Sequence, residues 1–353
     1  MTLIADAVRT VLVPFLAVTG AVLFLLVGHV VVLRAVRELT FRRRQRSLAL
    51  YRPIVDDALY GEDPEESLER LTRAPRPQLA IIASLLVEPL RIAEGTITVR
   101  ARLAAAALGL LVRWETELGH RHWWIRAEAA HALGLMQYRS AVPQLVAALD
   151  DPYEEVRAAA VGALGHIAEP SAIPQLIARL AEQSRHQRVR VVGALHQFGS
   201  AVVPPLLDHA RSHQGDLVMV AELLGRIGAV GALGSLLEWC KDDRADVRAA
   251  AVHAIGAIGV DERAYYHLLR TLNDAAAEVR AEAAWALGRS GRQDAAAYLV
   301  PRLQDQWIVA AQSARALRNL GLAGRRALES AAAEDGGDLA RQMLWEYGAA
   351  PGA

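Results

Sequence analysis

Apolar residues recur at helical spacing along most of this chain, and the pattern itself repeats. Four ten-residue segments share the order Val/Ile-Arg-Ala, then alanine-rich positions, then Ala-Leu/Ile-Gly. Weaker copies end at Gly199, Gly225 and Gly321. The spacing between successive glycines is then close to the helical-hairpin period of known repeat architectures. The four clear copies are residues 125–134, 156–165, 247–256 and 279–288.

Each repeat predicts two helices. The first runs from the Val-Arg pair to the Leu-Gly pair, and we expect its glycine to be the left-handed residue that ends the helix. The second helix follows a short turn, with Pro143 and Pro174 near its start in two repeats. Two amphipathic helices of this length cannot bury their apolar faces alone, so the repeats must stack. The sequence therefore predicts an all-α fold, a superhelical α-solenoid of helical hairpins.

An apolar segment precedes the repeats. Residues 10–33 contain no ionisable side chain except His29 and lie between Arg9 and Arg34. As a helix this segment reaches roughly 36 Å, against a hydrocarbon core of about 30 Å. A cleaved signal peptide is the alternative, but it needs a basic start, a shorter apolar core and a small-residue cleavage site. The segment therefore predicts an uncleaved transmembrane helix.

Positive charge follows this segment rather than preceding it. Residues 1–52 hold eight arginines against Asp6 and Glu38, and only Arg9 stands before the span. Because positive charge stays cytoplasmic, we expect the N-terminus outside and the remainder in the cytoplasm, at the inner membrane. The arginines that could also bind anionic lipid are Arg34, Arg37, Arg42, Arg43, Arg44 and Arg46.

These patterns divide the chain into six parts. Residues 63–66 look like a helix start, and the apolar stretch 79–90 is too short to span a bilayer, so we expect a buried helix in an N-terminal cap. We expect 96–118 to be the first helix of the array. The parts are an extracytoplasmic 1–9, a span 10–33, a basic juxtamembrane helix 34–52, an irregular helical cap 53–120, repeats 121–335 and a C-terminal cap and tail 336–353.

Composition agrees with this fold and excludes several functions. The 353 residues are 53% hydrophobic but only 5% aromatic, which argues against a β-rich protein. Cys240 is the only cysteine, so neither an intramolecular disulfide nor a cysteine zinc site is expected. The 39 basic and 39 acidic side chains balance, which gives no general attraction to nucleic acid.

The repeats resemble HEAT repeats, specifically the short bacterial subtype also found in phycobilin lyases, over about residues 95–335. The resemblance implies the fold strongly and the function weakly, because the subtype serves scaffolds, lyase subunits and regulators. The run Trp123-Trp124-Ile125-Arg126-Ala127-Glu128-Ala129-Ala130 behind an apolar anchor resembles bacterial membrane-anchored HEAT-repeat proteins. Their genes often lie beside membrane glycosyltransferases, which implies such a partner.

Two sets of side chains recur at fixed places in the repeats. Arginines occupy one helical position, and an acid lies just before it in three repeats. We expect a structural ladder of ion pairs between adjacent repeats, with an anion-binding stripe as the alternative. The set is Arg126, Arg157, Arg248 and Arg280 with Glu155, Asp246 and Glu278.

Three residues before each repeat glycine the side chains form a second set, which stacking would align on one surface. Repeats about 10 Å apart are too far apart for a shared metal site, so we expect a contact surface and no metal. Trp123 and Trp124 are further candidates for a partner contact, because buried aromatic residues anchor interfaces. The set is His131, Gly162, His196, Glu222, His253 and Trp285.

No catalytic constellation and no cofactor motif emerges. Gly225, Gly228, Gly231 and Gly234 match neither a dinucleotide fingerprint nor a phosphate loop, and close packing explains them. We therefore expect a scaffold or adaptor that binds a protein at the inner membrane. The alternatives are a subunit of an enzyme like the bilin lyases and a regulator that responds to lipid.

Overall fold

The structure is a computed structural model that describes the backbone of residues 2–93, 95–182, 185–212, 217–333 and 337–348. Side chains are described for these residues except 2–22, 181–182, 185–186 and 347–348. Throughout this described part the regular structure is helical, and it contains no strand. The chain forms two compact units, residues 1–117 with 135–138, and residues 118–134 with 139–353.

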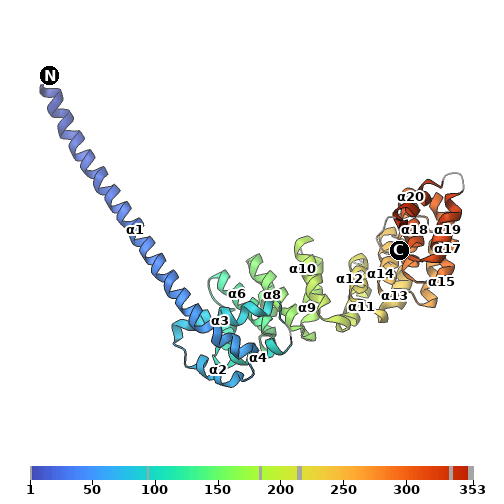
Figure 1. The fold of residues 1–353 in the computed structure, drawn as a ribbon, viewed down its shortest axis with the longest axis horizontal. Helices are drawn as coiled ribbons and strands as arrows, with labels where there is room; N and C mark the ends of the chain where they lie inside the picture. Colours follow the sequence, from blue (N-terminus) through green and yellow to red (C-terminus); the bar gives the residue numbers. More distant parts are fainter. Residues whose placement is uncertain (1, 94, 183–184, 213–216, 334–336, 349–353) are drawn as a thin grey trace. The chain divides into compact units, whose positions relative to one another are not determined.

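The first unit is built on one long helix, α1 (Thr2–Tyr60) (Figure 1). Its last turns bury Tyr51, Val55 and Leu59 against the short helices that follow. Residues 23–46 of the same helix are exposed. The short helices are α2 (Pro64–Thr72), α3 (Leu79–Val87), α4 (Thr96–Ala107) and α5 (Leu110–Glu117), with 3₁₀ turns at Arg76–Gln78 and Glu88–Arg91.

Two expectations for this unit are confirmed and one is wrong. α2 begins directly after Asp63, and α3 is buried through Ile82 and Leu86. The stretch 96–118 is not one helix, because it breaks at Gly109, whose φ is +70°. Only glycine adopts this left-handed conformation without a steric penalty, so the break divides the stretch into the hairpin α4–α5.

Among the described residues, no helix is long and apolar enough to cross a membrane. The predicted span 10–33 lies within α1, but the side chains of residues 10–22 are outside the described part of the chain.

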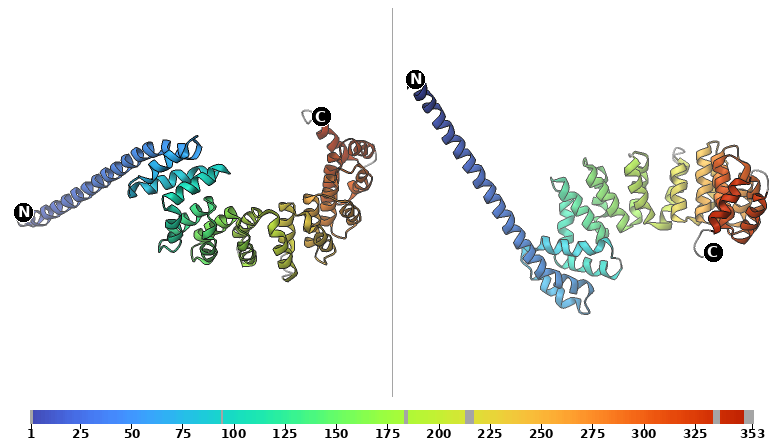
Figure 2. Two further views of the ribbon diagram at one scale, coloured as in Figure 1. Left: turned by 90° about the horizontal axis from the view of Figure 1, so that it is seen from below. Right: turned by 45° about the horizontal axis from the view of Figure 1, so that its top comes forward.

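The second unit is a row of helical hairpins, and Figures 1 and 2 show its first helices side by side. The all-α, repeat-based fold is confirmed. The first helices are α6 (Trp123–Leu135), α8 (Glu154–Ile167), α10 (Arg185–His196), α12 (Leu217–Ile227), α14 (Ala245–Ile258), α16 (Ala277–Arg289) and α18 (Trp307–Asn319). The second helices are α7 (Val142–Ala147), α9 (Ile173–Glu182), α11 (Val203–Ser212), α13 (Leu233–Trp239), α15 (Glu262–Thr271), α17 (Ala296–Leu299) and α19 (Leu322–Ala332), and α20 (Asp338–Gly348) packs on α18 and α19.

Five of the repeat glycines lie inside helices, so for these repeats the expectation that glycine ends the helix is wrong. It is confirmed for Gly199 and Gly321, which lie just past α10 and α18 with φ angles of 56° and 65°. Gly134 and Gly288 lie inside α6 and α16, where the next first helix approaches closely. A Cβ added at Gly134 would lie 2.5 Å from the Cα of Ala163, and one at Gly288 would lie 2.5 Å from the Cα of Ala316. The glycine is therefore required by contact between helix backbones rather than by its own dihedral angles.

The same contacts between first helices show that in two repeats another residue takes the position of the repeat glycine. Ala194 packs on Gly165 as Ala163 packs on Gly134, which places His196 at the repeat-glycine position of α10. Arg318 takes that position in α18. The corrected positions are spaced more regularly along the chain than the glycines that the sequence pattern singled out. They are Gly134, Gly165, His196, Gly225, Gly256, Gly288 and Arg318.

The left-handed residue of each repeat lies three positions after this contact. Five of these seven positions hold glycine, and two hold residues with a side chain, Gln137 and Ala168, each with φ of 50°. Ala168 is the C-cap of α8 and donates its N–H to the carbonyl of Leu164. The glycines are Gly199, Gly228, Gly259, Gly291 and Gly321.

Replacing Ala168 by glycine is therefore expected to stabilise the protein by about 0.5–1 kcal/mol. The left-handed conformation costs an L-residue about 1–2 kcal/mol, and the greater freedom of glycine in the unfolded chain offsets part of that gain. The matched variant Gly259→Ala changes the equivalent C-cap, with φ of 131°, in the opposite direction and should destabilise. Urea unfolding followed by circular dichroism measures both, and a destabilised Ala168→Gly variant would contradict the expectation.

Candidate functional site

The repeated arginines form a ladder along the start of the first helices. Arg280 donates through Nε and Nη2 to both carboxylate oxygens of Asp305, at 2.9 and 2.6 Å. Arg248 makes the same two-pronged contact with Asp274, and Arg126 makes it with Asp151. The side chains of Arg280 and Asp305 are only 12% and 13% exposed, so the contact is largely shielded from water.

Two of these aspartates, Asp151 and Asp274, each join two repeats. The Asp274 carboxylate accepts from Arg248, and its backbone carbonyl accepts from Nη1 of Arg280 at 2.9 Å. The Asp151 carbonyl likewise accepts from Arg157 at 2.7 Å. A chain of charge-assisted hydrogen bonds therefore runs from one repeat to the next.

The ladder uses other carboxylates than those predicted, so that part of the prediction is wrong. The aspartates lie in the turns, 25 or 26 residues after the arginine they bind. Of the expected partners, Asp246 accepts from the N–H of Val247, and Glu155 and Glu278 form no hydrogen bond or ion pair within the described part of the chain. The turn aspartate that recurs a fixed distance before the next arginine was the sequence signal for the correct partner.

The ladder lowers the pKa of its carboxylates. The hydrogen bond from Arg248 is the largest cause of the lowered pKa of Asp274, and the N–H of Ala276 adds to it. The hydrogen bond from Arg280 lowers the pKa of Asp305 in the same way, against the opposing effect of burial. These groups are therefore ionised at neutral pH and hold the arginines in place.

His253 and Trp285, predicted to share a surface, contact each other. Their rings are stacked at 4.3 Å between centroids and 6° between planes. His253 Nδ1 lies 2.8 Å from a carboxylate oxygen of Glu282. The guanidinium of Arg289 lies 5.1 Å from the centre of the Trp285 ring. A ring stack and an ion pair therefore join α14 to α16 at this place, and the cation–π contact lies within α16.

The other histidine candidates do not join this cluster. His131 is half-buried on α6, and His196 is exposed at the end of α10. In the corrected phase Gly193, rather than His196, takes the equivalent position in α10. The predicted column of histidines is therefore interrupted in the middle of the array.

The hydrogen bond to Glu282 raises the pKa of His253, with Glu222 adding to it and Arg289 opposing. A group whose pKa is raised on folding stabilises the fold below its unfolded pKa of about 6.5, and this contribution is lost as pH rises through the folded value. We therefore expect the contact between α14 and α16 to weaken as pH rises through that range. Titration of the His253 ring by NMR checks this, with Glu282→Gln as the variant that should lower the pKa again. A wild-type pKa at or below about 6.5 would contradict it.

Trp123 and Trp124 lie at the start of α6 and are partly exposed. Trp124 is 50% exposed and stacks on His122 at 4.3 Å, and Trp123 stacks on Tyr153 at 6.0 Å. The two indoles meet edge to face at 6.1 Å. The cluster is thus ordered by its own ring contacts and still presents aromatic area to a partner.

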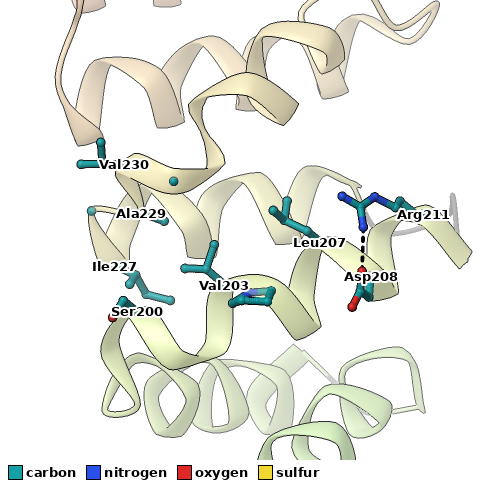
Figure 3. Close-up of a pocket in the computed structure, with 11 residues that line it drawn as sticks. Ser200, Val203, Leu207, Asp208, Arg211, Ile227, Ala229 and Val230 are labelled. Atoms are coloured by element: carbon teal, nitrogen blue, oxygen red, sulfur yellow. Dashed lines mark hydrogen bonds and ion pairs between the residues drawn. The ribbon is translucent and has the colours of Figure 1, made fainter.

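Three grooves open on the second unit. A groove of about 580 Å³ crosses α12, α14 and α16 between Glu222, Asp246 and His253. A groove of about 460 Å³ lies between α8 and α10 over Gly162 and Gly193. The third, of about 590 Å³, is apolar and lies between α11 and the turn at 227–231 (Figure 3). Its lining includes Val203, Leu207 and Ile227, with the Asp208–Arg211 pair at one end.

The glycine-rich turn beside the third groove is only partly close-packed. A Cβ at Gly225 would meet the Cα of Ala254, but Gly228, Gly231 and Gly234 have open space around them. The expectation of close packing therefore holds only for the first of these glycines.

Among the described residues neither Cys240 nor the two close histidine pairs of the sequence, His120–His122 and His209–His213, form a reactive or metal site. Burial raises the pKa of the Cys240 thiol to about 12, which leaves it protonated and unreactive at neutral pH. Among the described residues no group of three or more His, Cys, Asp or Glu could hold a metal ion. His213 of the pair His209–His213 lies outside those residues.

Family models match the repeat array. The model described as HEAT repeats matches residues 111–195, 149–222 and 203–278, and the model described as PBS lyase HEAT-like repeat matches 279–305. Together these matches cover more than half of the chain. This chain is a HEAT-repeat protein. The resemblance inferred from the Val-Arg and Leu-Gly pattern is confirmed, including the lyase-type repeat.

Solved structures of other proteins match this chain at low sequence identity. The matching chain of the Kap95:Nup1 complex is 12% identical, with 87% of this chain and 50% of that chain covered and a TM-score of 0.50. The complex of CpcE and CpcF of phycocyanin lyase from Nostoc is 22% identical, with 66% and 92% covered and a TM-score of 0.32. No curated protein matches the sequence.

Proposed function

We propose that this HEAT-repeat protein is a membrane-anchored scaffold that binds a protein partner and holds it at the inner membrane, with the repeats in the cytoplasm. The observation that carries the proposal is the exposure of α1. Leu23, Phe24 and Leu25 are 63%, 79% and 70% exposed, and the apolar run continues to Leu33. An apolar surface of this extent is unfavourable in water, and the hydrocarbon core of a bilayer would shield it.

The arginines after the apolar run fit the same arrangement. Residues 34–46 are exposed on α1, so the basic side chains face solvent or lipid headgroups. Near an anionic surface each contributes about 1 kcal/mol of attraction. The last turns of the same helix are fixed in the first unit by Tyr51, Val55 and Leu59, which supports a continuous link between anchor and folded chain.

A protein partner is the ligand that the repeats fit best. A HEAT-type structure similar in fold was determined as the Kap95:Nup1 complex, in which the two named proteins are bound to each other. The exposed rings of Trp124 and Tyr153 offer aromatic contact area. We propose a membrane glycosyltransferase of polysaccharide synthesis as the partner, on the resemblance to anchored HEAT-repeat proteins.

Two other functions remain as candidates. A bilin-lyase-like enzyme subunit rests on the lyase-type repeat at 279–305. A regulator that responds to lipid rests on the exposed basic stretch of α1. For the regulator, replacing Arg42, Arg43 and Arg44 should abolish activity without preventing insertion, and unchanged activity would exclude it.

The first experiment is co-purification from the native cell in mild detergent, followed by mass spectrometry. We expect a stoichiometric membrane enzyme with the wild-type protein. Isolation of the protein alone would overturn the scaffold proposal, and a coloured or tetrapyrrole ligand would favour the lyase-like candidate. Membrane topology is tested separately by fusing alkaline phosphatase to the C-terminus. We expect the fusion to be inactive, and an active fusion would show that the orientation is the reverse of the one proposed.

A further inference from the structure

We propose that the groove across α12, α14 and α16 binds a lysine- or arginine-rich segment of the partner protein. This inference rests on the proposed scaffold function and names where on the array, and by what chemistry, the partner is held. The groove has a volume of about 580 Å³ and is formed within the second unit.

The depth of the groove follows from the packing of the first helices. Gly225 lets the backbone of α14 approach, with 2.9 Å from its would-be Cβ to the Cα of Ala254. The floor is then formed by Gly225 with Ala249, Ala250 and Ala257, so a long side chain of a ligand can lie close to the helix backbones. A floor of small residues accepts many kinds of ligand, so the side chains of the walls determine which ligand binds.

The walls carry three carboxylates, Glu222, Asp246 and Glu282, and the first two make few contacts within the fold. Glu222 makes no hydrogen bond or ion pair within the described part of the chain, where Asp246 accepts only from the N–H of Val247. Glu282 is bound to His253, and Arg226 also lines the groove. Three carboxylates therefore face one guanidinium and one imidazole, and a cationic segment complements them.

Helix-dipole stabilisation does not account for this charge. Asp246 lies in the first turn of α14, where a carboxylate is favourable. Glu222 and Glu282 lie in the middle of α12 and α16, beyond the reach of that effect. They are also not ladder residues, because the turn aspartates bind the ladder arginines.

A second groove on the first helices lacks this acidity. The groove between α8 and α10 has the same small floor, with Ala158, Gly162 and Gly193. Its ionisable lining residues are His166 and Arg190, and no carboxylate is among the described residues that line it. A cationic segment is thus directed to the groove of α12, α14 and α16.

The test uses the full-length protein in mild detergent and a fluorescein-labelled nona-arginine peptide, with anisotropy as the readout. We expect the double variant Glu222→Gln/Asp246→Asn to bind about tenfold more weakly, since each lost pair in a partly exposed site is worth up to a factor of about five. The matched control Glu238→Gln/Glu262→Gln removes two exposed carboxylates from α13 and α15 and should bind like wild type. A steric variant, Ala250→Trp, fills the groove without changing charge and should also weaken binding.

Equal binding by the wild type and both charge variants would overturn the groove as the site. Co-purification separates this failure from failure of the scaffold function. If Glu222→Gln/Asp246→Asn still brings down the partner that wild type brings down, the array binds protein but at another surface. If wild type brings down nothing, the scaffold proposal fails whatever the peptide does.

Discussion

Replacing Gly134 by alanine is expected to destabilise the protein by about 2 kcal/mol, although alanine is the better helix former. The new Cβ would lie 2.5 Å from the Cα and 2.7 Å from the Cβ of Ala163, so α6 and α8 must move apart. Overpacking of this kind costs about 1–3 kcal/mol or more when backbone is involved, and the helix propensity of alanine returns about 1 kcal/mol.

The matched control is Gly162→Ala, a glycine inside the neighbouring helix α8 with nothing within 4 Å of its would-be Cβ. At this position only the higher helix propensity of alanine changes the stability, so the variant should be more stable than wild type by about 0.5–1 kcal/mol. Urea unfolding of the full chain in mild detergent, followed by circular dichroism, measures both. Changes of the same sign at the two glycines would contradict the close contact between the first helices.

Replacing Arg280 by methionine is expected to destabilise the protein by about 2–3 kcal/mol. The variant removes two hydrogen bonds to Asp305 and two to the carbonyls of Asp274 and Ala275, and it leaves the carboxylate of Asp305 largely shielded without its main partner. Hydrogen bonds to charged groups are worth about 1.5–3 kcal/mol, and loss of one member of a shielded pair costs more than the pair contributes.

The control is Arg211→Met, which breaks an ion pair whose two side chains are both 72% exposed. Such pairs contribute about 0–1 kcal/mol, so little change is expected. The dependence of the free energy of unfolding on pH, measured at acid pH, gives an independent check. Because the pKa values of Asp274 and Asp305 are lowered on folding, their contribution is present above the unfolded value of about 3.9 and is lost as pH falls through the folded value. The loss should be smaller in Arg280→Met, and an unchanged acid profile would show that the ladder carries no stability.

The two repeated features have different roles in specifying this fold. The glycine–alanine contacts set how closely successive first helices approach, and His196 and Leu223 replace the small residues where α10 meets α12. Those two helices contact each other less than α8 and α10 do, or α12 and α14. The ladder fixes the register of one repeat on the next through side chains that reach across the turn.

The sequence by itself determined the class of the fold and the composition of each repeat. Helical spacing of apolar residues, the Val-Arg and Leu-Gly pairs and the prolines at 143 and 174 predicted stacked hairpins, because these are local properties of a chain that must bury one face of each helix. The positions of α2 and of the buried helix α3 followed from the same signals. The ladder arginines were also evident, because they recur at one helical position.

Only the tertiary structure decided which residues these signals connect. The glycines of the four clear repeats looked like helix ends, but the close approach of the neighbouring helix backbone requires them. A contact between helices of different repeats has no local signature in the sequence. The ladder carboxylates were misassigned because Asp246 and Glu278 are near the arginines in sequence. The turn aspartates do recur in the sequence, but only the fold shows that Asp274 and Asp305 reach the arginine of the preceding first helix. The glycine contacts depend on close packing, and the ion-pair ladder depends on shielding from water. Both of these follow from how the repeats stack, which separation along the sequence does not show.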